Sequence, residues 1–100
     1  MDAEIDALLA DVVPEMPKSE FDSHEVIKQI FQFRQRAYVG LLAYAVESHP
    51  DMEHVFQYVH GRIGKRLKAI APSLQLSEGI SIKSKDIFGQ IDGCEHYERL

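Results

Sequence analysis

Apolar residues recur every three to four positions along the first seventy residues, which is the spacing of one face of an α-helix. The first set predicts a short amphipathic helix over residues 2–13 and consists of Ile5, Leu8, Leu9 and Val12. Because an isolated helix of this length is marginal in water, we expect residues 1–20, an acidic N-terminal arm and linker, to dock on the body of the protein or on a partner.

A second helix is predicted from residue 22 to about Ser48. Asp22 and Glu25 have the spacing of a capping box, and Phe21 and Val26 flank them as a hydrophobic staple. The apolar face then continues through Val26, Ile27, Ile30, Phe31, Tyr38, Leu41, Leu42 and Ala45. Since glycine weakens a helix interior, we expect any bend to occur at Gly40.

A third helix is predicted over residues 50–70, with Pro50 in its first turn and Pro72 beyond its end. Its apolar positions are Met52, Val55, Phe56, Val59, Ile63, Leu67 and Ile70. A short turn separates the second and third helices, so residues 21–72 are expected to form a long antiparallel hairpin.

Residues 73–100 have a different pattern. Leu74, Leu76, Ile80 and Ile82 alternate with polar residues, which predicts extended structure around Gly79. We expect Ser84 to cap a short helical turn over residues 85–88, whereas the last residues are compatible with either strand or helix. The predicted fold is mainly α (small α or α+β), in one domain over residues 1–100 with a mixed C-terminal segment.

Composition adds an expectation about location. The single cysteine, Cys94, excludes an internal disulfide and suits a reducing compartment. No basic start with an apolar core resembles a signal peptide, and the longest apolar stretch, residues 37–46, is about half the ~20 residues needed to span a bilayer. We therefore expect a cytoplasmic protein that does not associate with membranes.

The net charge of −5 is unevenly distributed. Residues 1–20 carry six acidic side chains and one lysine, whereas residues 61–70 carry four basic side chains and no acidic one. The basic segment, "HGRIGKRLKAI", also contains Gly61 and Gly64. On a helical wheel both glycines lie opposite the apolar stripe that is centred on Val59. Either they are exposed and tolerated, or another element or a second subunit approaches them closely. We favour the close approach, with the acidic arm as one candidate.

The same ten residues, "GRIGKRLKAI", resemble the Gly-x-x-Gly segment and following helix of KH domains. The resemblance implies a loop in which Gly61 and Gly64 let the backbone approach nucleic-acid phosphates. The candidate contacts to an anion or nucleic acid are Arg62, Lys65, Arg66 and Lys68. Whether residues 61–64 form a helix or a loop stays open at this point.

Two arginines lie within predicted apolar stripes, Arg34 in the second helix and Arg66 in the third. The favoured interpretation is that their stems cover apolar surface while the charged ends reach water. The alternative is buried ion pairing, in which they form bidentate pairs with carboxylates.

Candidate chemistry is sparse. His54 and His60 are six residues apart and do not share a helix face, whereas Cys94 and His96 would share a strand face, with Asp92 and Glu95 nearby. Zinc usually needs three or four converging ligands, and no second ligand motif supplies them, so we expect no metal site. No nucleotide-binding or nucleophile motif is present, and we expect neither a cofactor nor enzymatic activity.

The sequence thus predicts a small non-enzymatic interaction or regulatory protein that acts through helical surfaces. Two helices cannot enclose a core alone, so the expected partner is a second copy of the chain, most simply in a homodimer, or another protein. The alternative is a nucleic-acid-binding module that uses the Gly61–Lys68 segment.

Overall fold

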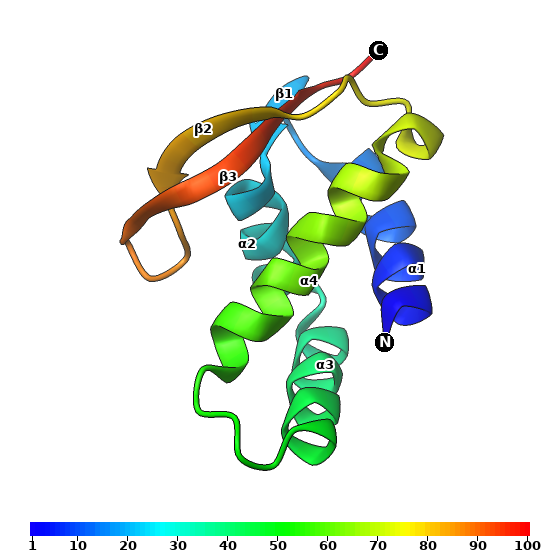
Figure 1. Cartoon of the computed structure of the whole chain (residues 1–100). Helices are drawn as coiled ribbons and strands as arrows, with labels where there is room; N and C mark the ends of the chain where they lie inside the picture. Colours follow the sequence, from blue (N-terminus) through cyan, green and yellow to red (C-terminus); the bar gives the residue numbers. More distant parts are fainter.

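The computed structural model describes all 100 residues, as four α-helices and a small antiparallel sheet (Figure 1). The helices are α1 (Asp2–Val12), α2 (Ser23–Phe33), α3 (Gln35–Ser48) and α4 (Val55–Ile70), and short 3₁₀ turns follow α1 (Val13–Glu15) and α4 (Ala71–Leu74). The strands are β1 (Glu20–Asp22), β2 (Ile80–Lys85) and β3 (Ile91–Glu98), in the order β1-β3-β2. The prediction of a mainly α or α+β fold is confirmed.

The core joins α1, α2, α3 and α4 to the inner side of the sheet. Ile5 and Leu9 of α1, Ile30 of α2, Ile63 of α4 and Tyr97 of β3 are all fully buried within one apolar cluster. The N-terminal segment is therefore part of the core rather than a detached arm. No helix combines the length and apolar character that crossing a membrane requires.

The predicted start of the second helix is confirmed in detail. Asp22 accepts a hydrogen bond from the backbone N–H of Glu25 at 2.9 Å, and the Glu25 carboxylate accepts one from the N–H of Asp22 at 3.3 Å. This capping box fixes the junction between β1 and α2. Because β3 pairs with β1, the junction also lies beside β3.

The single long helix over residues 22–48 was a wrong prediction. The chain leaves helical geometry at Arg34, with φ −134° and ψ 52°, whereas Gly40 lies inside α3. At this break the Arg34 side chain donates to Asp11 in the last turn of α1, to Glu15 in the 3₁₀ turn after it, and to the carbonyl of Phe33. The first arm of the predicted hairpin is thus two helices, and α4 packs alongside α3 and α1 (Figure 1).

Pro50 was also placed wrongly, since α4 begins five residues later, at Val55. Pro50 instead occupies the second position of a turn that the Met52 N–H closes on the carbonyl of His49 at 3.0 Å. The fixed φ of proline suits this position of a β-turn as well as it suits a first helical turn.

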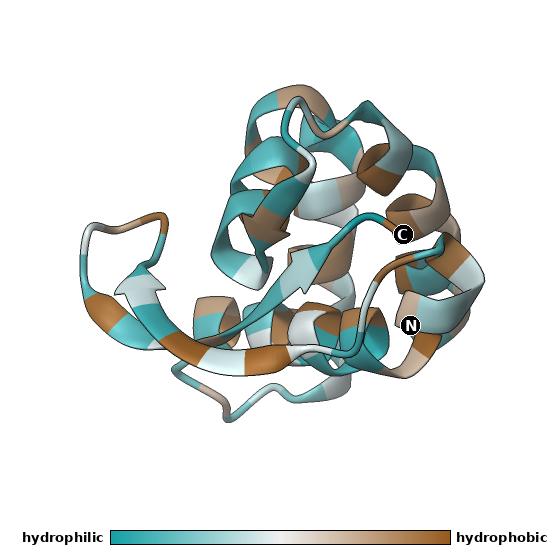
Figure 2. Cartoon of the chain, turned by 90° about the horizontal axis from the view of Figure 1, so that it is seen from above, coloured by the Kyte–Doolittle hydropathy of each residue, from teal (hydrophilic) through white to brown (hydrophobic).

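The C-terminal segment forms a β-hairpin. Its strands β2 and β3 pair along their length, from Ile80 opposite His96 to Lys85 opposite Ile91. Apolar and polar residues alternate over the first four positions of β2, whereas its last two residues, Ser84 and Lys85, are both polar; Figure 2 colours the chain by hydropathy. The predicted helical turn over residues 85–88 is wrong, because Asp86 instead caps the hairpin loop by accepting hydrogen bonds from the N–H groups of Phe88 and Gln90, both at 2.9 Å. The strand β1 was not predicted.

Candidate functional site

The basic segment is a continuous helix, because α4 runs through both Gly61 and Gly64. The loop that the KH resemblance implies is therefore absent from this structure. The four basic residues also divide between two sides of α4. Arg62 and Arg66 face α1, whereas Lys65 and Lys68 line a cleft on the other side.

The arginines that face α1 are paired with its first carboxylates. Arg66 forms a bidentate pair with Asp6, with both N–O distances at 2.8 Å, and Arg62 pairs with Asp2. Hydrogen bonding to Arg62 lowers the pKa of Asp2, and hydrogen bonding to Arg66 lowers the pKa of Asp6. The acidic segment thus neutralises half of the basic segment.

Arg34 is the third arginine that forms ion pairs with the N-terminal segment, donating to Asp11 and Glu15 at 2.8 Å each. The side chains of Arg34 and Arg66 are 27% and 29% exposed, respectively. Both arginines are ion-paired, but neither pair is fully buried: Arg66 is bidentate to one carboxylate, as the alternative interpretation expected, whereas Arg34 contacts two different carboxylates.

Gly61 and Gly64 face a cleft of about 380 Å³ between α4, the first turn of α2 and β3. A Cβ atom added at either glycine would have no heavy atom of the chain within 4 Å. No element of the chain makes the close approach that we favoured, so neither the acidic arm nor the C-terminal tail fills this role. An approach by a partner remains a prediction. The two glycines leave the middle of the α4 wall without side chains, between Gln57 and His60 on one side and Lys65 and Lys68 on the other.

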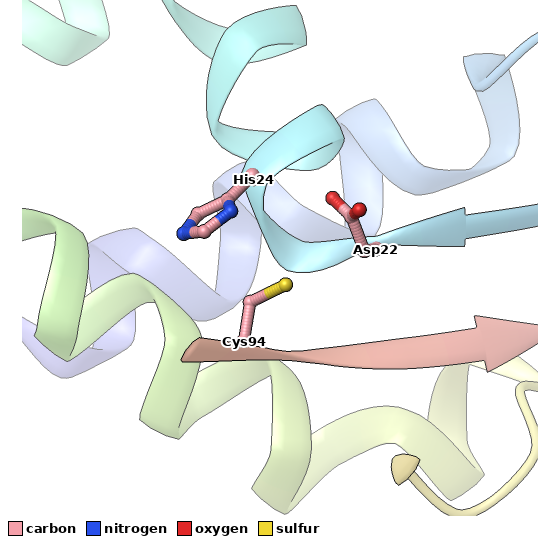
Figure 3. A group of neighbouring side chains, drawn as sticks. All are labelled: Asp22, His24 and Cys94. Atoms are coloured by element: carbon pink, nitrogen blue, oxygen red, sulfur yellow. The ribbon is translucent and has the colours of Figure 1, made fainter. Parts of the chain in front are cut away.

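Polar side chains from three elements lie close together at the opposite side of the cleft, where His24 and Cys94 line it and Asp22 lies behind them. Asp22 ends β1, His24 lies in the first turn of α2, and Cys94 lies on β3; Figure 3 shows these side chains facing one another. Ser84 of β2 connects two of them, with its Oγ 2.8 Å from His24 Nδ1 and 3.3 Å from Cys94 Sγ. Carboxylate, imidazole and thiol groups thus meet within a small volume.

His60 lies at one end of the cleft among aromatic rings. Its Nε2 is 2.7 Å from the hydroxyl of Tyr38, and its ring stacks on Phe88, at the tip of the β-hairpin, with centroids 5.9 Å apart. Burial lowers the pKa of His60. His60 therefore connects the hairpin loop to α3 through α4.

A second candidate surface lies on α3, on the side turned away from the core. Tyr38, Leu41 and Ala45 face inward and are buried, whereas Val39 is 60% and Tyr44 is 51% exposed. An apolar groove of about 370 Å³ runs between α3 and α1 and is lined by Met1, Glu4, Leu8, Ala37, Gly40, Leu41 and Tyr44. A further groove on α3 is lined by Gln35, Arg36, Val39, Gly40 and Ala43.

Two charges frame this surface. Arg36 in the first turn and Glu47 in the last turn are both exposed, and neither has an ion-pair partner within the chain. Both charges interact unfavourably with the macrodipole of α3, because a helix is stabilised by acidic residues near its N-terminus and by basic residues near its C-terminus. The spacing of four, three and four residues along Arg36, Gly40, Ala43 and Glu47 is the sequence signal that would have predicted this face.

No family model, curated protein or solved structure matches the chain.

Proposed function

We propose that the protein is a non-enzymatic interaction module that forms a homodimer through the outer face of α3. The observation that carries this proposal is that this face is complementary to itself. The residues at its centre are small and the residues on its flanks are apolar. Its two ends bear opposite charges that have no ion-pair partner within the chain.

The complementarity follows from positions along the helix. Arg36, Gly40, Ala43 and Glu47 follow one another at intervals of four, three and four residues and therefore share one face. In an antiparallel pair of α3 helices with its two-fold axis between residues 41 and 42, position 36 lies opposite 47, and position 40 lies opposite 43. A two-fold interface repeats each such contact twice.

The apolar flanks fit the same arrangement. Val39 and the exposed Val46 lie on one flank of this face and Tyr44 lies on the other. Because the two-fold axis keeps each flank on the same side, Val39 would pack near Val46 of the other copy, and the two copies of Tyr44 would lie on the opposite flank. Gly40 and Ala43 leave room between the helices, and close-packed helices have axes about 8–10 Å apart. The exposed apolar side chains of α3 would then be removed from water, which is the main favourable contribution to association.

The charges supply a reason for the choice of partner. Arg36 and Glu47 each weaken an isolated α3 through the helix macrodipole. In the antiparallel pair, each arginine lies beside the glutamate of the other copy and the two unfavourable placements become two intermolecular ion pairs.

Light scattering or sedimentation across protein concentration tests the proposal. The wild-type chain should reach twice its monomer mass of 11.4 kDa as concentration rises. Val39→Glu should shift the protein toward the monomer. Ile91→Glu is the matched control, because Ile91 is equally exposed, at 63% against 60% for Val39, but lies on β3. A wild-type monomer at all concentrations, or a Val39→Glu variant that still dimerises like the wild type, would contradict the proposal.

A charge reversal tests the register itself. Arg36→Glu should weaken the dimer, because it places like charges opposite each other, and the double variant Arg36→Glu/Glu47→Arg should restore it. The single substitution should meanwhile stabilise the monomer slightly, since it suits the macrodipole. If Arg36→Glu weakens the dimer without lowering the stability of the monomer, the substitution acts on the interface and not on folding. A double variant no better than Arg36→Glu alone would exclude this register.

A further inference from the structure

We propose that Asp22, His24 and Cys94 form a zinc site with one coordination position open to the cleft. The three residues come from β1, α2 and β3, and their sequence positions give no ligand motif, since Cys94 lies seventy residues after His24. The fold brings them together, because β3 pairs with β1 and the capping box places the start of α2 beside that pair.

The distances suit a metal ion after small side-chain movements. One ligand atom from each residue lies within 4.8 Å of the other two. Zinc binds oxygen and nitrogen at about 2.0–2.2 Å and thiolate sulfur at about 2.3 Å, so tetrahedral ligands lie roughly 3.3–3.7 Å apart. The proposal requires the His24 and Cys94 side chains to rotate so that the ligand atoms approach one another by about 1 Å.

The donor types select the metal. A carboxylate and a thiolate together contribute two negative charges, which balance those of Zn²⁺, and imidazole is a neutral ligand. Calcium and magnesium prefer oxygen ligands alone, whereas zinc accepts sulfur, nitrogen and oxygen in one site. This mixed set of ligands therefore favours zinc over calcium and magnesium.

The surroundings hold the ligands in place. Asp22 is only 7% exposed, and one carboxylate oxygen accepts from the Glu25 N–H, which leaves the other oxygen available. The Ser84 hydroxyl contacts Nδ1 of His24, which leaves Nε2 as the ring nitrogen without this contact, and it also contacts Sγ of Cys94. Hydrogen bonds of this kind to metal ligands fix side-chain orientation and raise affinity.

The open position follows from the cleft. His24 and Cys94 line the cleft of about 380 Å³, so a metal bound to them is accessible from that side. Three protein ligands and one exchangeable position are typical of zinc sites that bind a further ligand, whereas structural sites are closed by four protein ligands. Gly61 and Gly64 leave the facing wall of the cleft open to such a ligand.

Cobalt and zinc titrations of the full-length, phosphine-reduced protein test this site. Co²⁺ should bind with one-to-one stoichiometry and give the near-ultraviolet charge-transfer absorption of a cobalt–thiolate bond. Zn²⁺ should displace it, and competition with a chromophoric chelator then gives the zinc affinity. The absence of thiolate absorption from the wild-type protein would overturn the proposal without recourse to any variant.

The variants assign the ligands. Cys94→Ser should abolish the charge-transfer band, and both Cys94→Ser and His24→Gln should weaken zinc binding at least tenfold, with circular dichroism establishing that each is folded. His96→Gln is the matched control, because Glu20, His96 and Glu98 form a separate, more exposed group of possible ligands. It should bind zinc as the wild type does. Wild-type affinity in Cys94→Ser, or loss of binding in His96→Gln alone, would refute the site.

Discussion

Gly64 and Gly79 have opposite surroundings. A Cβ atom at Gly64 would meet nothing within 4 Å, whereas one at Gly79 would lie 3.0 Å from the Cε1 and hydroxyl oxygen of Tyr97. Tyr97 is fully buried, its hydroxyl has no hydrogen-bond partner, and burial raises its pKa to about 12. The ring is packed on all sides, so it has little freedom to move away from a new methyl group.

We therefore expect alanine to have opposite effects at the two positions. Gly64→Ala should stabilise the protein by about 0.5–1 kcal/mol, since it removes a glycine from a helix interior at no steric cost. Gly79→Ala should destabilise it by about 1–3 kcal/mol through overpacking. Urea denaturation followed by circular dichroism measures both. Gly61→Ala should behave as Gly64→Ala does; a loss of stability there would mean that the α4 wall of the cleft is occupied in solution.

At the scale of elements, α1 is held by two kinds of contact. Its apolar face is buried in the core, and its outer carboxylates Asp2 and Asp6 pair with Arg62 and Arg66 of α4. Hydrogen bonding to these arginines lowers the pKa of both aspartates. Because these pairs are partly exposed, their contribution is modest and is weakened by salt.

This pairing predicts an acid-dependent loss of stability. A carboxyl group whose pKa is lowered by folding stabilises the protein fully above the usual aspartate pKa of about 3.9 and loses that effect as pH falls through its lowered folded value. The free energy of unfolding, measured in urea from pH 7 down to pH 2.5, should therefore decrease in the acid range. Asp6→Asn should show a shallower decrease and less sensitivity to salt. Parallel curves for Asp6→Asn and the wild type would show that the Arg66 pair contributes nothing.

Elements were predictable from sequence where their signal is local. Residues 2–12 show the helical period within themselves, and Asp22 and Glu25 form a capping box over three residues. The break at Arg34 was not predictable, because the apolar spacing continues on both sides of this residue. The partners of the Arg34 side chain lie 19 and 23 residues earlier in the sequence. The three-residue β1 is too short to show a period, and it forms because residues 96–98 pair with it.

The same distinction applies to the candidate sites. The outer face of α3 could be read from the sequence, because its charged and small residues recur at a helical period. The Asp22, His24 and Cys94 cluster could not, since it exists only after β3 has paired with β1. Cys94 and His96 do share a strand face, but the fold gives them different neighbours: Cys94 contacts Ser84, and His96 contacts Glu20.

At the scale of the whole molecule, the two proposed surfaces belong to different parts of the fold. The cleft is formed by α2, α4 and β3, whereas the dimer face is the outer side of α3. The inner side of α3 packs through Tyr38, Leu41 and Ala45 into the core that separates them. His60, which lies at the end of the cleft, contacts Tyr38 on the inner side of α3 and so links the cleft to that helix.

We therefore expect the two activities to be independent. Sites that are more than about 7–10 Å apart and share no contacts usually add to within roughly 0.3–0.5 kcal/mol, which is about a twofold change in affinity. Zinc affinity should accordingly be the same within about twofold in the wild type and in Val39→Glu. The dimer dissociation constant should likewise be the same within about twofold with zinc and with a chelator. Because coupling between two binding events is reciprocal, a larger change in one measurement must appear in the other. If such coupling is observed, His60→Gln should remove it, since His60 connects the cleft to α3. Coupling that persists in His60→Gln would mean that the two surfaces communicate through the core.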